Sequence, residues 1–578
     1  MAAKNRRLGF VVILVAIFAV LFIVNRRQKL AAEPADLILI NGKIVTVDDR
    51  FPTATWIALR GDRISALGSD PKGFNRHVGD STEIIDLGGA LTIPGLIESH
   101  GHFTGLGQSK TVLDLTKARS WDDIVALVAE AARSAKPGDW ILGRGWHQDK
   151  WDRAPEPNVE GLPFHNALSK VSPENPVLLI HASGHSSLAN AKAMELSKIT
   201  ATTTNPSGGE IVRDARGNAI GAFIEEAQGL VRYEAGHDTP EEAAAVARKL
   251  VGLAAQECLA NGVTTFHDAG ASLSTVDLYK AMAEEGTLPV RLYVMFSAGS
   301  KTLAEKGLAY RMIGAGDNHL TVRTIKRLID GALGSHGAWL LEPYADLPPD
   351  AKNPAGLNTE SIEEMKATAK FAIENGFQVA THAIGDRGNR ETLDIYEEAF
   401  KAHPDKTDLR WRIEHAQHLS PADIPRFAAL GVVPAMQAIH CTSDGPWVLK
   451  RLGEKRAEEG AYVWRKLINA GSMIPIGTDV PVEPIDPMAN FFAAVTRRLK
   501  DGTTFFPDQK MTRDEALRAY TINGAYAAFE TGLKGSLAPG KLADITVLSR
   551  DILTCPEDDI LSTEVLYTII GGKVLYHR

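Results

Sequence analysis

The chain has 578 residues with 63 basic and 71 acidic side chains, so its formal net charge near neutral pH is −8. This length exceeds what one hydrophobic core organises, and the acidic balance argues against nucleic acid as a partner. Apolar residues make up 44% and charged residues 23%, which excludes global disorder. The three cysteines, Cys258, Cys441 and Cys555, are too few and too far apart for a disulfide framework or a cysteine-based zinc site.

The N-terminal segment contains an uninterrupted apolar run of 17 residues, 8–24, flanked by three basic residues on each side. A helix of this length spans about 26 Å, enough for a thin bilayer. A cleaved signal peptide is the alternative, but the polar residues 25–29 make a poor small-residue cleavage site. We therefore expect residues 1–35 to form a single-pass membrane anchor, with the remaining chain on the extracytoplasmic side.

Both ends of the chain are rich in predicted β-strands. Residues 36–47 predict two strands joined at Asn41-Gly42, another pair follows at 56–60 and 63–67, and strand-like runs recur at 543–548 and 566–575. Neither terminal piece is long enough to bury its own core. We therefore expect residues 36–90 and 531–578 to meet in one small β-sandwich domain, with residues 91–530 inserted between them.

The middle of the chain alternates between strand-like and helix-like segments. A long helix is predicted to open at Thr239-Pro240 and to end near Gly262, and another is predicted at 362–375 with Ser361 as its cap. The predicted strands after the first one are 263–266, 290–296, 320–329, 377–381, 411–413, 432–436 and 473–476. About eight strand–helix units from Leu91 onward predict a (β/α)₈ TIM-like barrel.

A large insertion is expected in this barrel. The span from Leu91 to Val480 is 390 residues, whereas a barrel needs about 250. The best candidate is the stretch 120–239, which includes Trp146. Insertions of this kind lie over the barrel mouth and shape the substrate pocket.

Four predicted strand ends carry side chains of the type that binds metals. His100 and His102 lie two residues apart on one strand, so both imidazoles point the same way. His382, His415 and Asp479 each follow a later strand, at the barrel edge that holds catalytic groups. A single histidine at such a place is more often a cap or a hydrogen-bonded loop residue. Four coincidences at one end of successive strands favour a metal site.

Lys326 is placed on the same strand face as Asp330, four residues later. If Asp330 lies at the rim, Lys326 faces the barrel interior. An unpaired buried lysine is costly or loses its charge, and a neutral amine can react with carbon dioxide to give a carbamate that bridges two cations. A surface or salt-bridged lysine is the alternative that spacing leaves open.

The chain resembles the amidohydrolase superfamily, and more closely its family 3 branch, which includes N-substituted formamide deformylases. The resemblance rests on Lys326 and on the segments 36–44, 93–102, 183–186, 330–331, 382–386, 412–417 and 535–544. It covers about residues 36 to 578, which is everything except the expected anchor.

The resemblance implies a centre with two divalent cations. The implied metal ligands are His100, His102, Lys326, His382, His415 and Asp479. The first-strand pair and Asp479 would bind the more buried cation, the two later histidines would bind the second, and carboxylated Lys326 would bridge them. Zinc is expected from the imidazole-rich ligands, with manganese, iron and cobalt as alternatives. Asp479 would also serve as the proton shuttle for a metal-activated hydroxide.

Other polar residues are candidates for contact with the substrate. His440 follows the strand 432–438 and is a candidate catalytic residue that meets the substrate or its developing oxyanion. His185 and Trp146, both in the insertion, and Asp330 are candidate substrate-binding residues. An ordinary hydrogen-bonding or packing role is the alternative for each.

These observations predict a metal-dependent hydrolase that cleaves non-peptide carbon–nitrogen bonds in an N-substituted amide or formamide. A cyclic-amide hydrolase or a deaminase of the same superfamily is the second hypothesis, against which Lys326 argues mildly. A catalytically inactive, membrane-tethered binding protein is the third, against which the complete ligand set argues. The expected partners are a small-molecule amide and the membrane, with no nucleic acid, and a homo-oligomer is left open.

Overall fold

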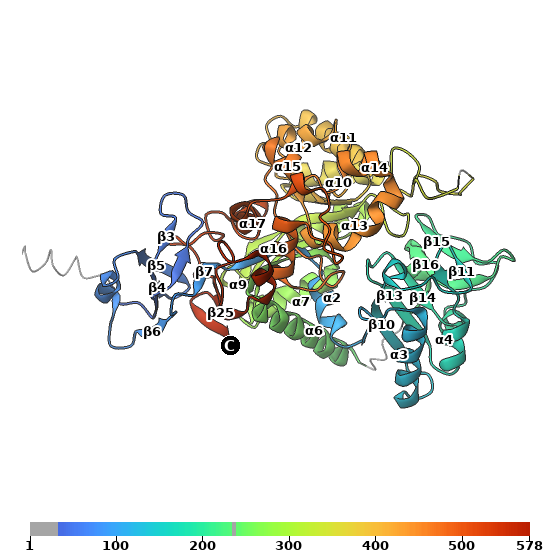
Figure 1. Ribbon diagram of the computed structural model, residues 1–578, viewed down its shortest axis with the longest axis horizontal. Coiled ribbons are helices and arrows are strands. Elements are labelled where there is room, and N and C mark those ends of the chain that lie inside the picture. Colours follow the sequence, from blue (N-terminus) through green and yellow to red (C-terminus); the bar gives the residue numbers. More distant parts are fainter. Residues whose placement is uncertain (1–32, 234–238, 349) are drawn as a thin grey trace, which may run out of the picture.

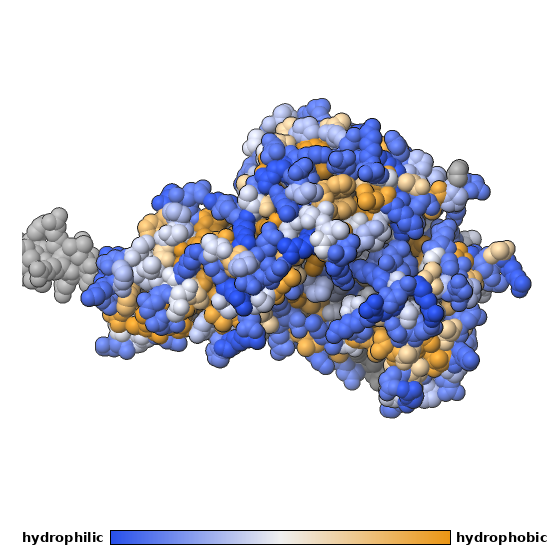
Figure 2. All heavy atoms as spheres, viewed as in Figure 1, coloured by the Kyte–Doolittle hydropathy of each residue, from blue (hydrophilic) through white to orange (hydrophobic). Residues whose placement is uncertain are grey.

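The computed structural model describes residues 33–233, 239–348 and 350–578. Three regions follow one another along the long axis of the molecule: a small β-domain, the barrel with its helices, and a β-rich insertion (Figure 1). On the face shown in Figure 2, hydrophilic residues cover much of the surface, and apolar residues form separate patches between them.

The central sheet is a nearly closed parallel barrel of seven strands. Their order is β8 (Leu96–Gly101), β17 (Val263–Ala271), β18 (Arg291–Phe296), β20 (Leu320–Leu328), β21 (Gln378–Ala383), β22 (Arg412–His415) and β23 (Val433–Ala435). Every neighbouring pair in this series is parallel. The short strand β19 (Met312–Gly314) pairs antiparallel with β20 beside the barrel.

An irregular segment takes the place of the predicted eighth strand. Residues 473–479 run between β23 and β8. Ile476 forms an isolated parallel bridge to Met436 on one side, and the Ile476 carbonyl accepts the Ser99 amide at 3.3 Å on the other. Pro475 has no N–H to donate, and Asp479 has a φ of +61°, so a regular ladder cannot continue here. The prediction of eight regular strands is therefore corrected to seven strands and one closing segment.

Helices connect the strands and pack around the barrel (Figure 1). Two of the predicted caps are present: Thr239 and Glu242 form a capping box, and the Ser361 side chain accepts the Glu364 amide. The helices of this region are α2 (Phe103–Ser109), α6 (Pro240–Ala260), α7 (Leu273–Glu284), α8 (Ser300–Lys306), α9 (Ala315–Asn318), α10 (Ile362–Asn375), α11 (Asp386–Ala402), α12 (Ile424–Leu430), α13 (Ala438–Leu452), α14 (Glu454–Gly460), α15 (Trp464–Asn469), α16 (Pro487–Thr496), α17 (Arg513–Ala519) and α18 (Ile522–Ala527).

The insertion lies in the chain between α2 and α6 and has hydrophobic clusters of its own. Its main sheet has the order β15-β16-β14-β13-β10-β9. Its elements are β9 (Leu113–Asp114), α3 (Trp121–Ser134), β10 (Ile141–Trp146), β11 (Asn158–Val159), β12 (Leu162–Pro163), α4 (Asn166–Val171), β13 (Val177–His181), β14 (Ser186–Ala189), α5 (Ala191–Leu196), β15 (Gly209–Arg213) and β16 (Ala219–Glu225).

Both ends of the chain contribute strands to the small β-domain. One sheet has the order β5-β4-β1-β6 and the other β26-β25-β24-β7-β2-β3. Ile57 near the start of the chain and Ile545 near its end belong to the same buried cluster. The strands are β1 (Leu37–Ile40), β2 (Lys43–Val45), β3 (Thr53–Ala54), β4 (Trp56–Arg60), β5 (Arg63–Gly68), β6 (Glu83–Asp86), β7 (Leu91–Pro94), β24 (Ile545–Leu548), β25 (Val565–Ile570) and β26 (Lys573–His577).

The predicted membrane localisation is corrected. Among the helices of the described ranges, none has the length and apolar character needed to cross a bilayer. The expected anchor, residues 8–24, lies outside these ranges. The placement on the extracytoplasmic side depended on that anchor and is given up with it.

Candidate metal centre

The predicted ligands come together at one rim of the barrel. His100 lies in β8, and His102 is the first residue after that strand. His382 lies in β21, and His415 ends β22. The ring centroids of His100 and His415 are 4.6 Å apart, and those of His382 and His415 are 4.5 Å apart. Because the carboxyl ends of parallel strands meet at one edge, residues far apart in sequence converge here.

Asp479 lies between several of these imidazoles. Its Oδ1 is 3.5 Å from His100 Nε2 and 3.2 Å from His102 Nε2, and its Oδ2 is 3.8 Å from His440 Nε2. Two groups of three side chains bring one ligand atom each to within 4.8 Å of one another: His100, His102 and Asp479, and His415, His440 and Asp479. His382 belongs to neither group, and its Nε2 lies 3.5 Å from Asp330 Oδ1.

Several ligand atoms of this cluster are buried without a hydrogen-bond partner in the described part of the chain. They are Nε2 of His100, His382 and His440, and Oδ1 of Asp479. Buried polar atoms are normally paired, and each exception calls for an explanation such as a missing ion. Imidazole nitrogens and a carboxylate are ligands that suit zinc. The donor set therefore fits a divalent cation.

Neighbouring polar side chains fix the orientation of two imidazoles. Glu414 accepts a hydrogen bond from His100 Nδ1, and Arg412 donates two hydrogen bonds to Glu414 at 2.6 and 3.0 Å. His415 Nδ1 donates to Gln437 Oε1 at 2.7 Å. Because a carboxylate and an amide oxygen can only accept, both Nδ1 atoms carry hydrogen and both Nε2 atoms are left to bind a cation.

The backbone leaves regular strand geometry at two ligands. The φ angles of His415 and Asp479 are +75° and +61°, values that are uncommon for residues other than glycine. Consecutive side chains on a regular strand face opposite sides. The left-handed conformation at His415 allows it and its neighbour Glu414 both to face the cluster. Backbone strain of this kind gathers at functional sites.

Lys326 is buried inside the barrel, as its position on the strand predicted. It lies in β20 and is 3% exposed. Burial lowers the pKa of Lys326 to about 8, although Glu414 and Asp479 act in the opposite direction. Its charge is among the causes, after burial, that lower the pKa of His100. A lysine in this state has a substantial neutral fraction near physiological pH, as carbamate formation requires.

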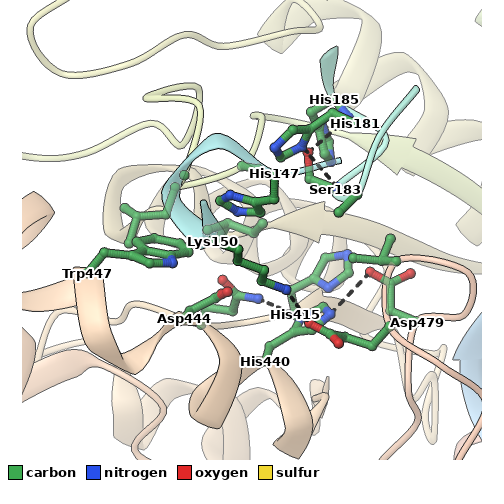
Figure 3. A pocket seen from close by; sticks show the side chains of 18 of the residues that line it. His147, Lys150, His181, Ser183, His185, His415, His440, Asp444, Trp447 and Asp479 are labelled. Carbon is green, nitrogen blue, oxygen red and sulfur yellow. Dashed lines mark hydrogen bonds and ion pairs between the residues drawn. The ribbon is translucent and has the colours of Figure 1, made fainter. Parts of the chain in front are cut away.

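A pocket opens above the cluster, and the insertion supplies one of its walls (Figure 3). An ion pair between Lys150 and Glu483 joins the insertion to the barrel at 3.4 Å, and Arg451 binds Asp149 at 3.0 Å beside it. The labelled lining residues are His147, Lys150, His181, Ser183 and His185 from the insertion, and His415, His440, Asp444, Trp447 and Asp479 from the barrel.

Two candidate residues line this pocket, although their roles stay predictions. His440 lies near the start of α13, and its Nδ1 is 3.0 Å from the Gln417 side-chain amide. His185 Nδ1 lies 2.8 Å from Glu225 Oε2. Burial alone would lower the pKa of His185, but Glu225, together with Asp479 and Asp330, acts in the opposite direction, and the pKa lies above its ordinary value.

Two other residues predicted to bind substrate, Asp330 and Trp146, do not line this pocket, and that role stays a prediction for both. The Asp330 carboxylate is fully buried and accepts the backbone amides of residues 339, 384 and 385 at 2.9, 3.0 and 2.7 Å, so it holds the loops after β20 and β21. Trp146 is 0% exposed, and its Nε1 donates to the Leu179 carbonyl at 3.0 Å. Trp146 is a core residue of the insertion.

Sequence reasoning missed three buried carboxylates near the site. Glu414 was not predicted because regular strand alternation would direct its side chain to the face of the strand opposite that of His415. Glu225 was not predicted because no recognisable motif surrounds it in the insertion. Glu98 accepts the Thr478 amide at 2.6 Å, and burial raises the pKa of Glu98 to about 8. The alternation of β8, which places Glu98 on the face of His100, was the one signal available for it.

Comparison with known proteins decides the family. The family model described as "Amidohydrolase family" matches residues 83–576. The chain belongs to the amidohydrolase family. It is 35% identical over 557 residues to "Protein LONG AFTER FAR-RED 3" of Arabidopsis thaliana, covering 94% of this chain and 92% of that one. It is 28% identical over 550 residues to "N-substituted formamide deformylase" of Arthrobacter pascens, covering 94% and 98%.

A solved structure extends this relationship. An uncharacterized metal-dependent hydrolase from Pyrococcus horikoshii matches with a TM-score of 0.71 and 25% identity, covering 90% of this chain and 99% of that one. This amidohydrolase-family chain is therefore a hydrolase with the fold of metal-dependent relatives.

Proposed function

We propose that the protein hydrolyses the carbon–nitrogen bond of N-substituted amides, with N-substituted formamides as the first class to test. The observation that carries this proposal is the cluster of imidazoles around Asp479 beside one pocket, in which Nε2 of His100, His382 and His440 is buried and unpaired among the described residues. The substrate class is supported by the name of the Arthrobacter pascens relative, which aligns over 98% of its length.

The proposed metal site is built from six side chains that together would hold two cations. A divalent cation at this site would lower the pKa of a water molecule and polarise the scissile carbonyl. Zinc suits the ligands, and Lys326 would act in its carboxylated form. The residues proposed to hold the cations are His100, His102, Lys326, His382, His415 and Asp479.

The chain's own side chains supply proton transfer and orientation. Asp479, buried between the histidines, is placed to accept the proton of the attacking water and to pass it to the leaving nitrogen, so that an amide and water give a carboxylic acid and an amine. His440 Nε2 lies 3.8 Å from Asp479 Oδ2, and its proposed role is to stabilise the carbonyl oxygen as that oxygen develops charge. His185 lines the pocket from the insertion and would contact the amide from that side.

The outer part of the pocket is proposed to receive the N-substituent. Trp447 and His147 lie there with ring centroids 6.1 Å apart, next to the Lys150–Glu483 ion pair. An aromatic wall beside a polar pair suits a substituent that is apolar along most of its length.

The test combines metal analysis with hydrolysis of N-substituted formamides and N-acyl amines by the purified protein. We expect stoichiometric divalent metal, release of the amine, and loss of turnover in His100→Ala with the fold retained. Release of ammonia instead of a substituted amine would favour the deaminase hypothesis. A folded protein that binds no metal would contradict the proposal.

A further inference from the structure

Glu225 is a buried carboxylate of the insertion that lies against the pocket. Its side chain is 5% exposed, and its Oε2 lies 2.8 Å from His185 Nδ1. Its other oxygen, Oε1, is buried and has no hydrogen-bond partner within the described ranges. A buried charge is costly unless it is paired. Among the described residues, Glu225 forms its ion pair with His185.

The pairing of His185 with Glu225 follows from the register of the insertion sheet. Strands β14 and β16 are antiparallel with Ser186 opposite Ile224. The next pair along this register is His185 and Glu225, and the Glu225 amide donates to the His185 carbonyl at 2.9 Å. Directly opposed side chains of an antiparallel pair are close enough to interact. The two side chains thus meet at the end of the sheet that faces the barrel.

A loop of the barrel packs closely against the Glu225 carboxylate on its other side. A side-chain carbon added to either Gly331 or Gly337 would overlap with Glu225 Oε1, so this loop after β20 leaves room for the carboxylate only because it has glycine at both positions. Glu225 itself has φ of +48° and ψ of −127°. A non-glycine residue keeps such a conformation only when its surroundings enforce it, at a cost of about 1–3 kcal/mol.

The consequence of this arrangement is that Glu225 decides which nitrogen of His185 faces the pocket. A carboxylate can only accept a hydrogen bond, so Nδ1 is engaged with Glu225 whether the ring is neutral or charged. The other nitrogen, Nε2, is then the atom presented to the pocket. The His185 ring lies 5.0 Å from the ring of His382, between centroids.

We propose that Glu225 is a positioning residue that locks the His185 ring with Nε2 toward the scissile amide, an inference that rests on the proposed amidohydrolase function. The insertion thereby acts on the reacting group itself, through His185, in addition to enclosing the N-substituent. Orientation of this kind matters because a displacement of about 1 Å in a group that contacts the reacting atoms can cost about 10²-fold in rate.

A double-mutant cycle tests this role. The variants His185→Ala, Glu225→Ala and their combination are compared with Glu225→Gln, which keeps the shape and an accepting oxygen. Asp149→Asn is the matched control, because Asp149 also joins the insertion to the barrel, through Arg451, but does not contact His185. For each variant, kcat and KM are measured on the N-substituted formamide panel, and the dissociation constant of acetohydroxamate is measured by calorimetry. Metal content and thermal unfolding are measured to check the fold.

We expect His185→Ala to lower kcat by about 10²-fold and Glu225→Ala by about 10-fold or more, with smaller changes in KM. Adding Glu225→Ala to His185→Ala should then cost less than about 2-fold, and Glu225→Gln should recover part of the loss. In a double variant that combines Asp149→Asn with His185→Ala, the loss should equal the product of the two single fold-changes.

Additive losses for Glu225 and His185, in rate or in acetohydroxamate affinity, would overturn the positioning role. Failure of the wild-type protein to hydrolyse any amide would overturn the proposed function. The positioning role would still be tested in that case, because acetohydroxamate affinity is measured for the same His185 and Glu225 variants. A metal-loaded wild type that does not bind acetohydroxamate would overturn the inference, since no amide-like group would then be received near His185.

Discussion

Glu414 should control the metal affinity of the site without contacting the metal. It accepts hydrogen bonds from His100 Nδ1 and from two nitrogens of Arg412, and all three side chains are buried. Glu414→Gln keeps the volume but replaces one accepting oxygen by an NH₂ group. If that group faces His100, the imidazole must carry its hydrogen on Nε2, the atom that would bind the cation. If it faces Arg412, two donors oppose each other.

The expected loss follows from these contacts. Changes to partners that orient a metal ligand cost about 10- to 100-fold in metal affinity, which corresponds to roughly 1.4–2.8 kcal/mol. Removing one charge of a buried pair also destabilises a fold by about 3–5 kcal/mol, because Arg412 is left uncompensated. Affinity and unfolding must therefore be measured on the same samples.

Competition between the protein and a chelator of known affinity measures the dissociation constant for zinc. His267→Gln is the control: His267 Nδ1 accepts Arg412 Nη1 at 3.1 Å, so this change perturbs the same guanidinium and leaves Glu414 on His100. We expect Glu414→Gln to weaken zinc binding by at least about 10-fold and His267→Gln to weaken it by less than about 2-fold. A folded Glu414→Gln protein with unchanged zinc affinity would refute the reasoning.

Three further outcomes are expected. Asp479→Asn should lower kcat by about 10²- to 10⁴-fold, because the amide cannot accept the proton of water; turnover assays with circular dichroism would check this, and a loss of fold would contradict it. For Lys326 the folded pKa of about 8 lies below the unfolded value of 10.5, so the unfolded chain binds more protons between these limits. Stability of the metal-free protein should then rise as the pH increases from 8 to 10.5, and denaturant titrations should find this rise missing in Lys326→Met. Trp447→Ala should raise KM about 10-fold for bulky N-substituents while small formamides change little, and equal effects on both would place the substituent elsewhere.

The barrel strands and the ligand cluster were accessible from the sequence because both follow local rules. Apolar runs ending in His100, His382 and His415 predict strands whose carboxyl ends meet at one rim, and β8, β21 and β22 carry these three residues in turn. The closing segment could not be predicted, since the apolar run at 473–476 has the composition of a strand. Its irregularity depends on Pro475 and on the backbone conformation of Asp479.

Residues that act through other residues were the least accessible. The role of Glu225 depends on a register between two insertion strands and on two glycines of a barrel loop, and no single segment carries that information. Asp330 and Trp146 illustrate a different limit, because the sequence does not show which polar or aromatic side chains line the pocket. Both have side chains that suit ligand binding, but tertiary contacts use them to hold loops and to fill a core.

The irregular closing segment affects the stability of the junction between residues 473–479 and β8, where the barrel closes. His100 lies on the first strand and Asp479 on the last segment, and the Asp479 amide donates to the His100 carbonyl at 2.8 Å across the seam between them. A cation shared by these two side chains would cross-link the seam where regular sheet pairing is weakest. Chelation should therefore loosen this junction before any other part of the barrel, and backbone amides beside it should exchange with solvent first.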